Sequence, residues 1–164
     1  MDSAFYLKKF EKAANRIDKK ILIKKQIEIS VGLYQDSVFL KLYKKNWSNN
    51  IQNPIESESR IFFSLWINDL TLKEQKLFYN IHALKLRHLK GYSIESRKFA
   101  DVFRTHFKKF EHKWENVSVK FGPLTLMQGW IYITLESFEE KTIELTTNFL
   151  EITNLVDTTL AKFK

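Results

Sequence analysis

Histidines are the side chains in this sequence best suited to hold a metal ion or to transfer protons. The four of them form two pairs with one spacing, His82 with His88 and His106 with His112. Six residues along an α-helix turn the direction by about 600°, so the two side chains of a pair point about 120° apart. Helical metal ligands are instead spaced three or four residues apart. Neither pair can hold a metal ion from one helix, and the sequence predicts neither a metal site nor a cofactor.

Two other arrangements would place polar and aromatic side chains in a pocket. His88 and His106 meet if their helices pack side by side. Trp47, in an Asn-rich loop, and Gln128, in an apolar segment, would supply an aromatic wall and an amide donor if they lie close in space. In the alternative, His106 is a core histidine, Trp47 folds back onto a sheet, and Gly129 beside Gln128 marks a β-bulge. A small-molecule pocket between a sheet and two helices is therefore one hypothesis.

Sequence motifs of common enzymes are absent. The chain contains no HExxH, GxGxxG, GxxxxGK[ST] or GxSxG pattern. It also has no cysteine, which excludes disulfides, zinc–thiolate sites and cysteine nucleophiles. No catalytic residue is predicted, and the sequence favours a binding protein over an enzyme.

A basic segment in the second half of the chain is the strongest candidate for a binding surface. A helix beginning at an N-cap near Ser93 would present free N–H groups to an anion. Cations then recur along the same helix, as on a surface that contacts phosphates. The residues predicted to bind an anion or an acidic partner are Ser93, Ser96, Arg97, Lys98, Arg104 and Lys108. A serine cap followed by a solvated helix face would have the same pattern.

The net charge of +8 favours an acidic partner, with nucleic acid as the first candidate. Residues 1–120 carry 24 Lys and Arg against 13 Asp and Glu, a net charge of +11, whereas residues 121–164 carry 3 against 6, a net charge of −3. Lys accounts for 22 of the 27 basic residues, although Arg is the better ligand for phosphates and bases. Two further hypotheses stay open: a small-molecule protein or enzyme, and a protein-interaction module that dimerises through its C-terminal helix.

Hydrophobic spacing places the helices and strands. Period-two alternation predicts a β-hairpin from Gln26 to Leu42, and a third strand over about residues 60–67 follows a loop of residues 46–58. The predicted helices cover residues 3–20, 71–91, 93–114 and 137–163, and a second hairpin covers residues 117–135. Within the last helix, apolar residues recur at three- and four-residue steps from Leu145 to Phe163.

The order of these elements, α-βββ-αα-ββ-α, predicts an α+β fold. We expect one domain over residues 1–164, with a mainly antiparallel sheet of about five strands packed by helices and closed by a long C-terminal helix. The hydrophobic content of 44% is enough for a sizeable core. No apolar run approaches the roughly 20 residues that span a bilayer, and we expect a cytoplasmic protein.

Overall fold

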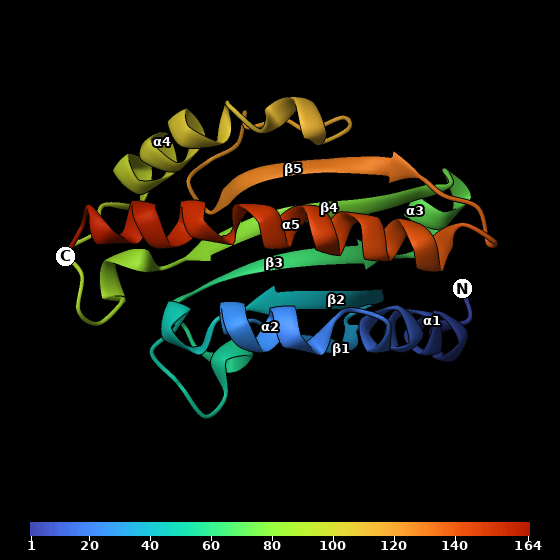
Figure 1. Ribbon diagram of the computed structural model, residues 1–164. Helices are drawn as coiled ribbons and strands as arrows, with labels where there is room; N and C mark the ends of the chain where they lie inside the picture. The colour runs from blue at the N-terminus through green and yellow to red at the C-terminus, as the bar shows by residue number, and fades with distance from the viewer.

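Five antiparallel strands form one sheet, in which each strand pairs with the next one along the chain (Figure 1). In this computed structural model, which describes residues 1–164, the order across the sheet is β1-β2-β3-β4-β5. The predicted α+β fold with an antiparallel sheet of about five strands is confirmed. The strands are β1 (Glu28–Tyr34), β2 (Ser37–Tyr43), β3 (Arg60–Ile67), β4 (Lys76–Leu84) and β5 (Thr125–Tyr132).

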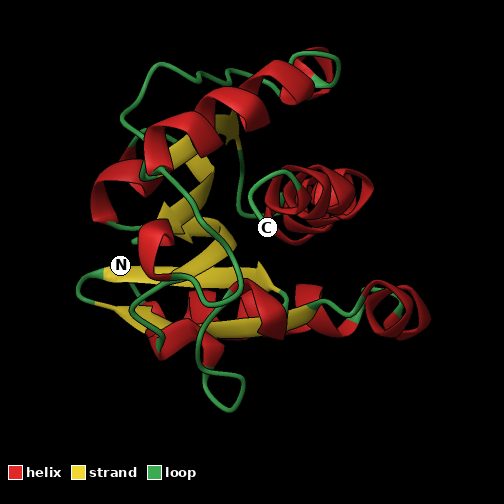
Figure 2. Cartoon of the chain, turned by 90° about the vertical axis from the view of Figure 1, so that its left-hand side faces the viewer, coloured by secondary structure: helices red, strands yellow, loops and turns green.

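Three longer helices pack on one face of this sheet. Figure 2 views α5 end-on and shows it lying to one side of the strands. The predicted long C-terminal helix is confirmed, and its stripe is buried from Leu145 to Leu160. The helices are α1 (Ser3–Asn15), α2 (Lys19–Lys25), α3 (Asp69–Lys73), α4 (Ser96–Phe107) and α5 (Phe138–Ala161). None of them is long and apolar enough to cross a membrane.

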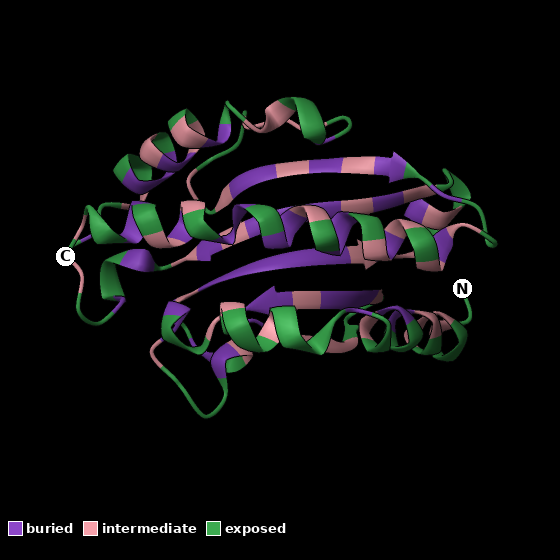
Figure 3. Ribbon diagram, in the orientation of Figure 1, coloured by how far each residue is buried: buried purple, intermediate pink, exposed green.

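The core fills the space between the sheet and these helices. Alternate residues of each strand point toward the helices, and the central strand β3 is buried along most of its length (Figure 3). Phe63 of β3 stacks on Phe149 of α5 with ring centroids 4.2 Å apart. Of the 50 buried residues, 36 form one hydrophobic cluster, and most of its members lie on the helix side of the sheet.

The segment 71–91 differs most from its predicted structure. A long helix was expected, but the chain forms the short helix α3 and then strand β4. A capping box between Asn68 and Thr71 starts α3, and Gln75 adopts a left-handed conformation (φ 59°) that ends it. Leu77 and Tyr79 then begin a buried alternating set on the helix side of the sheet. Long-range strand pairing therefore outweighs the local helical spacing.

Three other boundaries need correction. The predicted helix over residues 3–20 is two helices, because the Asp18 side chain accepts a hydrogen bond from the Lys20 amide and starts α2. Helix α4 begins at Ser96, so Ser93 is not its N-cap; the Ser93 amide instead donates to the carbonyl of Phe163. In the predicted second hairpin, residues 117–121 form no strand and contribute only an isolated bridge to β5.

Candidate functional site

A row of polar side chains crosses the face of the sheet that is turned away from α1, α4 and α5. The register pairs Ser30 with Lys41, Lys41 with Ser64, Ser64 with Asn80, and Asn80 with Gln128. Residues paired across neighbouring strands point to the same face. The five side chains therefore form a continuous polar strip over all five strands.

Aromatic side chains flank this polar strip. On one side, register aligns Phe39, Trp66, Phe78 and Trp130, and Trp66 stacks on Phe78 with ring centroids 4.9 Å apart. On the other side, Phe62 of β3 is paired in register with His82 of β4. We call this surface the open face; its residues are Ser30, Phe39, Lys41, Phe62, Ser64, Trp66, Phe78, Asn80, His82, Gln128 and Trp130.

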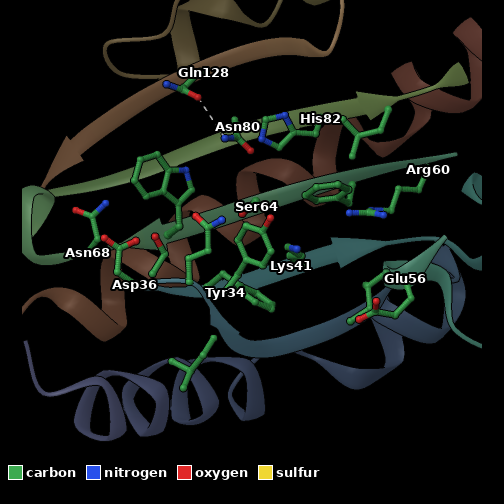
Figure 4. A pocket seen from close by; sticks show the side chains of 18 residues that line it. Tyr34, Asp36, Lys41, Glu56, Arg60, Ser64, Asn68, Asn80, His82 and Gln128 are labelled. Carbon is green, nitrogen blue, oxygen red and sulfur yellow. Dashed lines mark hydrogen bonds between the residues drawn. The ribbon is translucent and has the colours of Figure 1, made fainter. Parts of the chain in front are cut away.

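A cavity of about 680 Å³ lies on the open face over β2, β3 and β4. The turn of the β1–β2 hairpin, from Leu33 to Ser37, lines one part of it, and Ile55 and Glu56 of the β2–β3 loop line another. Figure 4 shows side chains from these strands and loops surrounding the cavity. Ligand-binding cavities commonly have volumes of roughly 300–1,000 Å³. The cavity is therefore large enough for a small organic molecule.

Lys41 places a positive charge in the middle of the cavity wall. Its Nζ lies 4.3 Å from the ring centroid of Phe39 and 4.7 Å from that of Phe62. It forms no hydrogen bond and no ion pair with another side chain. Burial lowers the pKa of Lys41 below its usual value, and the nearby charge of Arg60 lowers it further. Cation–π contacts stabilise the ammonium group, but its hydrogen-bonding capacity is unused.

Arg60 supplies the second cation of the cavity. Its guanidinium lies 5.2 Å from the centroid of the Phe62 ring, and its Nη1 donates to the Ser57 carbonyl. Its Nε is buried without an acceptor, and burial lowers its pKa. The exposed carboxylate of Glu56 raises the pKa of both Arg60 and Lys41, and so opposes the effect of burial. Glu56 therefore balances part of the positive potential at this end of the cavity.

His82 is neutral in this environment. Burial lowers its pKa, and although the contact with the Leu124 carbonyl opposes this shift, the charges of Lys41 and Arg60 lower the pKa further. Its Nδ1 lies 3.3 Å from the Leu124 carbonyl oxygen and 3.4 Å from Thr125 Oγ1. A proton on Nδ1 satisfies the carbonyl, which leaves Nε2 as a hydrogen-bond acceptor.

The depressed pKa of His82 makes folding stability depend on pH. Between the ordinary value of about 6.5 and the lower folded-state pKa, the unfolded chain binds a proton that the folded protein does not. The free energy of unfolding therefore falls as the pH drops through this range. We expect His82→Gln to remove this component, so that urea unfolding at pH values of about 7.5 and 5 shows a smaller loss than in the wild-type protein. An equal loss in both proteins would contradict the assignment.

Asn80 and Gln128 form an amide pair beside these charges. Asn80 Nδ2 donates to Gln128 Oε1 over 3.2 Å, as the dashed line in Figure 4 marks. Asn80 is 2% exposed, and its Oδ1 has no hydrogen-bond donor. An unsatisfied buried polar atom costs about 1–3 kcal/mol. The pair therefore contains unused hydrogen-bonding capacity at the cavity wall.

Of the four residues expected from the sequence to line a pocket, only Gln128 lines the cavity, and the other three lie elsewhere in the fold. His88 is exposed at the end of a 3-10 turn, and His106 lies on α4, where its Nε2 is 3.1 Å from Lys162 Nζ. Trp47 is 0% exposed on the helix side of the sheet, and its Nε1 donates to Asp157 Oδ1. The expected pocket lay between the sheet and two helices. Because residues 71–91 form no long helix, one of these two helices does not exist.

The predicted basic surface of α4 is partly used for internal contacts. Arg104 donates to the backbone carbonyls of Leu126, Phe121, Gly122 and Thr125. These bonds hold the segment before β5, where a strand had been expected, and they occupy the guanidinium. None of the remaining predicted residues lines the cavity on the open face: Ser93, Arg97, Lys98 and Lys108 are exposed, and Ser96 is half-buried at the start of α4.

Sequence reasoning did not bring together the two polar β4 residues of the open face, Asn80 and His82. Both were assigned to a helix, where their side chains would point in different directions. The available signal was the alternation of Leu77, Tyr79 and Ile81 with Phe78 and the two polar residues. It places the polar side chains together on one face of a strand.

No group of three or more His, Cys, Asp or Glu side chains is arranged to hold a metal ion. The chemistry available in the cavity is that of two cations, two carboxylates (Asp36 and Glu56), a neutral imidazole, two amides and flat apolar walls. Comparison of this chain with protein-family models, with curated proteins and with solved structures finds no match.

Proposed function

We propose that the protein binds a small anionic ligand with a flat apolar part in the cavity on the open face. The observation that carries this proposal is Lys41, a partly buried ammonium group that lines the cavity without a hydrogen-bond acceptor or an ion-pair partner. Charged groups are seldom buried without a partner, because desolvation is costly. An anionic group of a ligand would supply the missing partner.

The walls of the cavity favour a flat ligand. Phe39, Phe62 and Trp66 line the space around Lys41. Aromatic side chains interact well with planar rings, and rings within a few ångströms of each other gain about 0.5–1.5 kcal/mol beyond the area that they bury. A planar anion can therefore contact these rings while its charged end reaches the ammonium group.

The two other hypotheses raised by the sequence have weaker support. In the predicted phosphate-binding surface of α4, Arg104 already donates to four backbone carbonyls, and Lys98 forms an ion pair with Glu95. Dimerisation through α5 would need an exposed apolar stripe, but Leu145, Phe149 and Val156 face the core. The cavity, in contrast, contains the ammonium group of Lys41 without an acceptor, and Arg60 Nε and Asn80 Oδ1 without hydrogen-bond partners.

Binding of 1-anilinonaphthalene-8-sulfonate, a flat aromatic sulfonate, tests the proposal. We expect Lys41→Met to weaken the binding about tenfold or more, because a hydrogen bond to a charged group contributes about 1.5–3 kcal/mol. Fluorescence titration measures the affinity, and amide NMR shifts on β2, β3 and β4 locate the probe.

Lys120→Met is the matched control, since Lys120 is exposed and outside the cavity. It removes the same charge from the chain and should leave the affinity unchanged. If both substitutions weakened probe binding equally, the effect would come from the net charge of the protein and not from Lys41 itself. NMR shifts confined to another surface would show that the cavity is not the binding site. Either result would overturn the proposal.

A further inference from the structure

We infer that the anionic group of the ligand is a phosphate ester dianion, held between Lys41 and Arg60. This inference rests on the proposed function and adds the chemical class of the ligand: a flat molecule that carries a terminal phosphate. The observation behind it is a pair of cations that line one cavity and contact the same aromatic ring, while neither forms an ion pair with a carboxylate.

Both cations lie against the ring of Phe62. Lys41 Nζ is 4.7 Å from the ring centroid, and the guanidinium carbon of Arg60 is 5.2 Å from it. The two charges are close enough for Arg60 to lower the pKa of Lys41. Like charges in a partly buried site repel each other, and water screens this repulsion poorly. A group with two negative charges would offset both cations, whereas a carboxylate or a sulfonate would offset only one.

Each cation has a hydrogen-bond donor that is free and not sealed inside the protein. Lys41 Nζ donates to no protein atom and is not buried. Arg60 Nη1 donates to the Ser57 carbonyl, whereas Nη2 has no acceptor and, unlike Nε, is not buried. Figure 4 shows the guanidinium of Arg60 turned inward, toward Lys41. A phosphate ester has three terminal oxygens, so one can accept from the ammonium while another accepts from the guanidinium.

Glu56 is the acidic group that acts on both cations. Its exposed carboxylate raises the pKa of Lys41 and of Arg60, but it forms an ion pair with neither. It belongs to the loop between β2 and β3, where it repels an incoming anion. Glu56→Gln should therefore tighten the binding of a phosphate ester, by about two- to threefold.

The order of residues along β3 orients the ligand. Arg60 and Phe62 begin this strand, and Trp66 lies near its end, about 13 Å from Phe62 at about 3.3 Å per residue. Asp36 and Asn68 line the cavity at the Trp66 end, on the other side from Arg60 in Figure 4. The phosphate therefore lies at the Arg60 end, and the flat part extends toward Trp66. The carboxylate of Asp36 disfavours a second anionic group at that end.

Phenyl phosphate and phenyl sulfate separate a dianion from a monoanion. They share the ring, the ester oxygen and a tetrahedral group, but at a pH of about 7.5 the phosphate carries roughly two negative charges and the sulfate one. Each competes with the fluorescent sulfonate in a displacement titration. We expect phenyl phosphate to bind about tenfold more tightly than phenyl sulfate, because its second charge pairs with the second cation.

Inorganic phosphate tests whether the whole ester is recognised or only its charged group. It has the charge of the ester without the ring, so it should bind about tenfold more weakly than phenyl phosphate. Equal binding of the two would show that the flat part makes no contact, and it would overturn the assigned class of ligand.

Substitution of Arg60 tests the second cation directly. Arg60→Met keeps an unbranched side chain without the charge, and it should lower the ratio of the phenyl phosphate affinity to the phenyl sulfate affinity toward one. Arg97→Met removes the same charge from an exposed position on α4, outside the cavity, and should leave this ratio unchanged. Because Arg60 also holds the Ser57 carbonyl, thermal unfolding first compares its variant with the wild-type protein. Arg60→Gln, which retains a side-chain N–H donor, carries the test if Arg60→Met fails to fold.

The outcomes distinguish the inference from the proposed function. Equal affinities for phenyl phosphate and phenyl sulfate, with both weakened by Lys41→Met, would overturn the phosphate assignment and leave the anion site in place. An unchanged affinity ratio in Arg60→Met, or an equal fall in Arg97→Met, would exclude Arg60 as the second cation. If neither the fluorescent sulfonate nor any of the three probes shifts the amide signals of β2, β3 and β4, the inference and the proposed function are both wrong.

Discussion

Gly129→Ala is expected to destabilise the folded protein by about 3 kcal/mol, the upper part of the range for overpacked cores. A Cβ atom at this position would lie 2.3 Å from the hydroxyl oxygen of Tyr79, 2.5 Å from its Cζ and 2.9 Å from the backbone oxygen of Asn116. Tyr79 is fully buried, and its hydroxyl donates to the Glu115 carbonyl, so the ring cannot move away cheaply. Urea unfolding followed by circular dichroism measures the loss.

Gly122→Ala provides the matched control for this substitution. No atom lies within 4 Å of a Cβ built at Gly122, and its backbone is outside the left-handed region. Its free energy of unfolding should stay within about 0.5 kcal/mol of the wild-type value. If Gly129→Ala were equally mild, the close approach of β5 to the Tyr79 ring would not be a constraint on the fold.

Asp157→Ala is the second substitution with a large expected effect, also about 3 kcal/mol. One carboxylate oxygen accepts from Trp47 Nε1 at 2.8 Å, and the other accepts from Lys44 Nζ at 2.6 Å. Removal of the carboxylate leaves a buried indole N–H without an acceptor and a largely buried ammonium without its counter-charge. Thermal or urea unfolding should show the loss directly.

Two comparisons separate this network from the general cost of removing a carboxylate. Glu144→Ala removes an exposed acid from the same helix and should cost at most about 1 kcal/mol. In a Trp47→Phe background the indole donor is absent, so Asp157→Ala should become less costly than in the wild-type protein. Strict additivity of the two changes would mean that Trp47 and Asp157 are not energetically coupled.

The sequence was most informative where a single periodicity dominates. Strand β3 was expected over residues 60–67 and is found there, and the apolar stripe of α5 faces the core from Leu145 to Leu160. In both segments the spacing of apolar residues fits only one type of element. The fold class follows from such segments, because a long closing helix and a hairpin-rich first half are enough to favour an antiparallel α+β fold.

The segment from Leu77 to Leu84 was ambiguous because it fits both periods. Its apolar residues include three- and four-residue steps as well as strict alternation, and a buried strand cannot be distinguished from a helix by spacing alone. The pairing partners that decide the outcome are Arg60–Trp66 and Thr125–Tyr132, which are distant in sequence. Local spacing contains no information on this pairing.

The assignment of residues 77–84 to a helix also prevented the candidate site from being predicted. Gln128 was noted as a polar residue in an apolar strand, but its partner Asn80 was assigned to a helix, so the polar strip was not visible. Lys41 and Arg60 were counted only in the net charge, because nothing in the sequence shows that they lack counter-charges in the folded protein. Recognition of the site requires the strand register, which brings residues 30, 41, 64, 80 and 128 into one line.

The sequential strand order has a consequence for the order in which the protein forms during synthesis. Strands β1 to β4 pair with their neighbours in sequence, and together they include Lys41, Arg60, Asn80 and His82. Chains are made from the N-terminus, and short-range pairings have the smaller loop-closure cost. The cations and aromatic walls therefore come from a segment that leaves the ribosome early, whereas Gln128 must wait for α4 and β5. We therefore expect the amide pair to be the last part of the cavity to form.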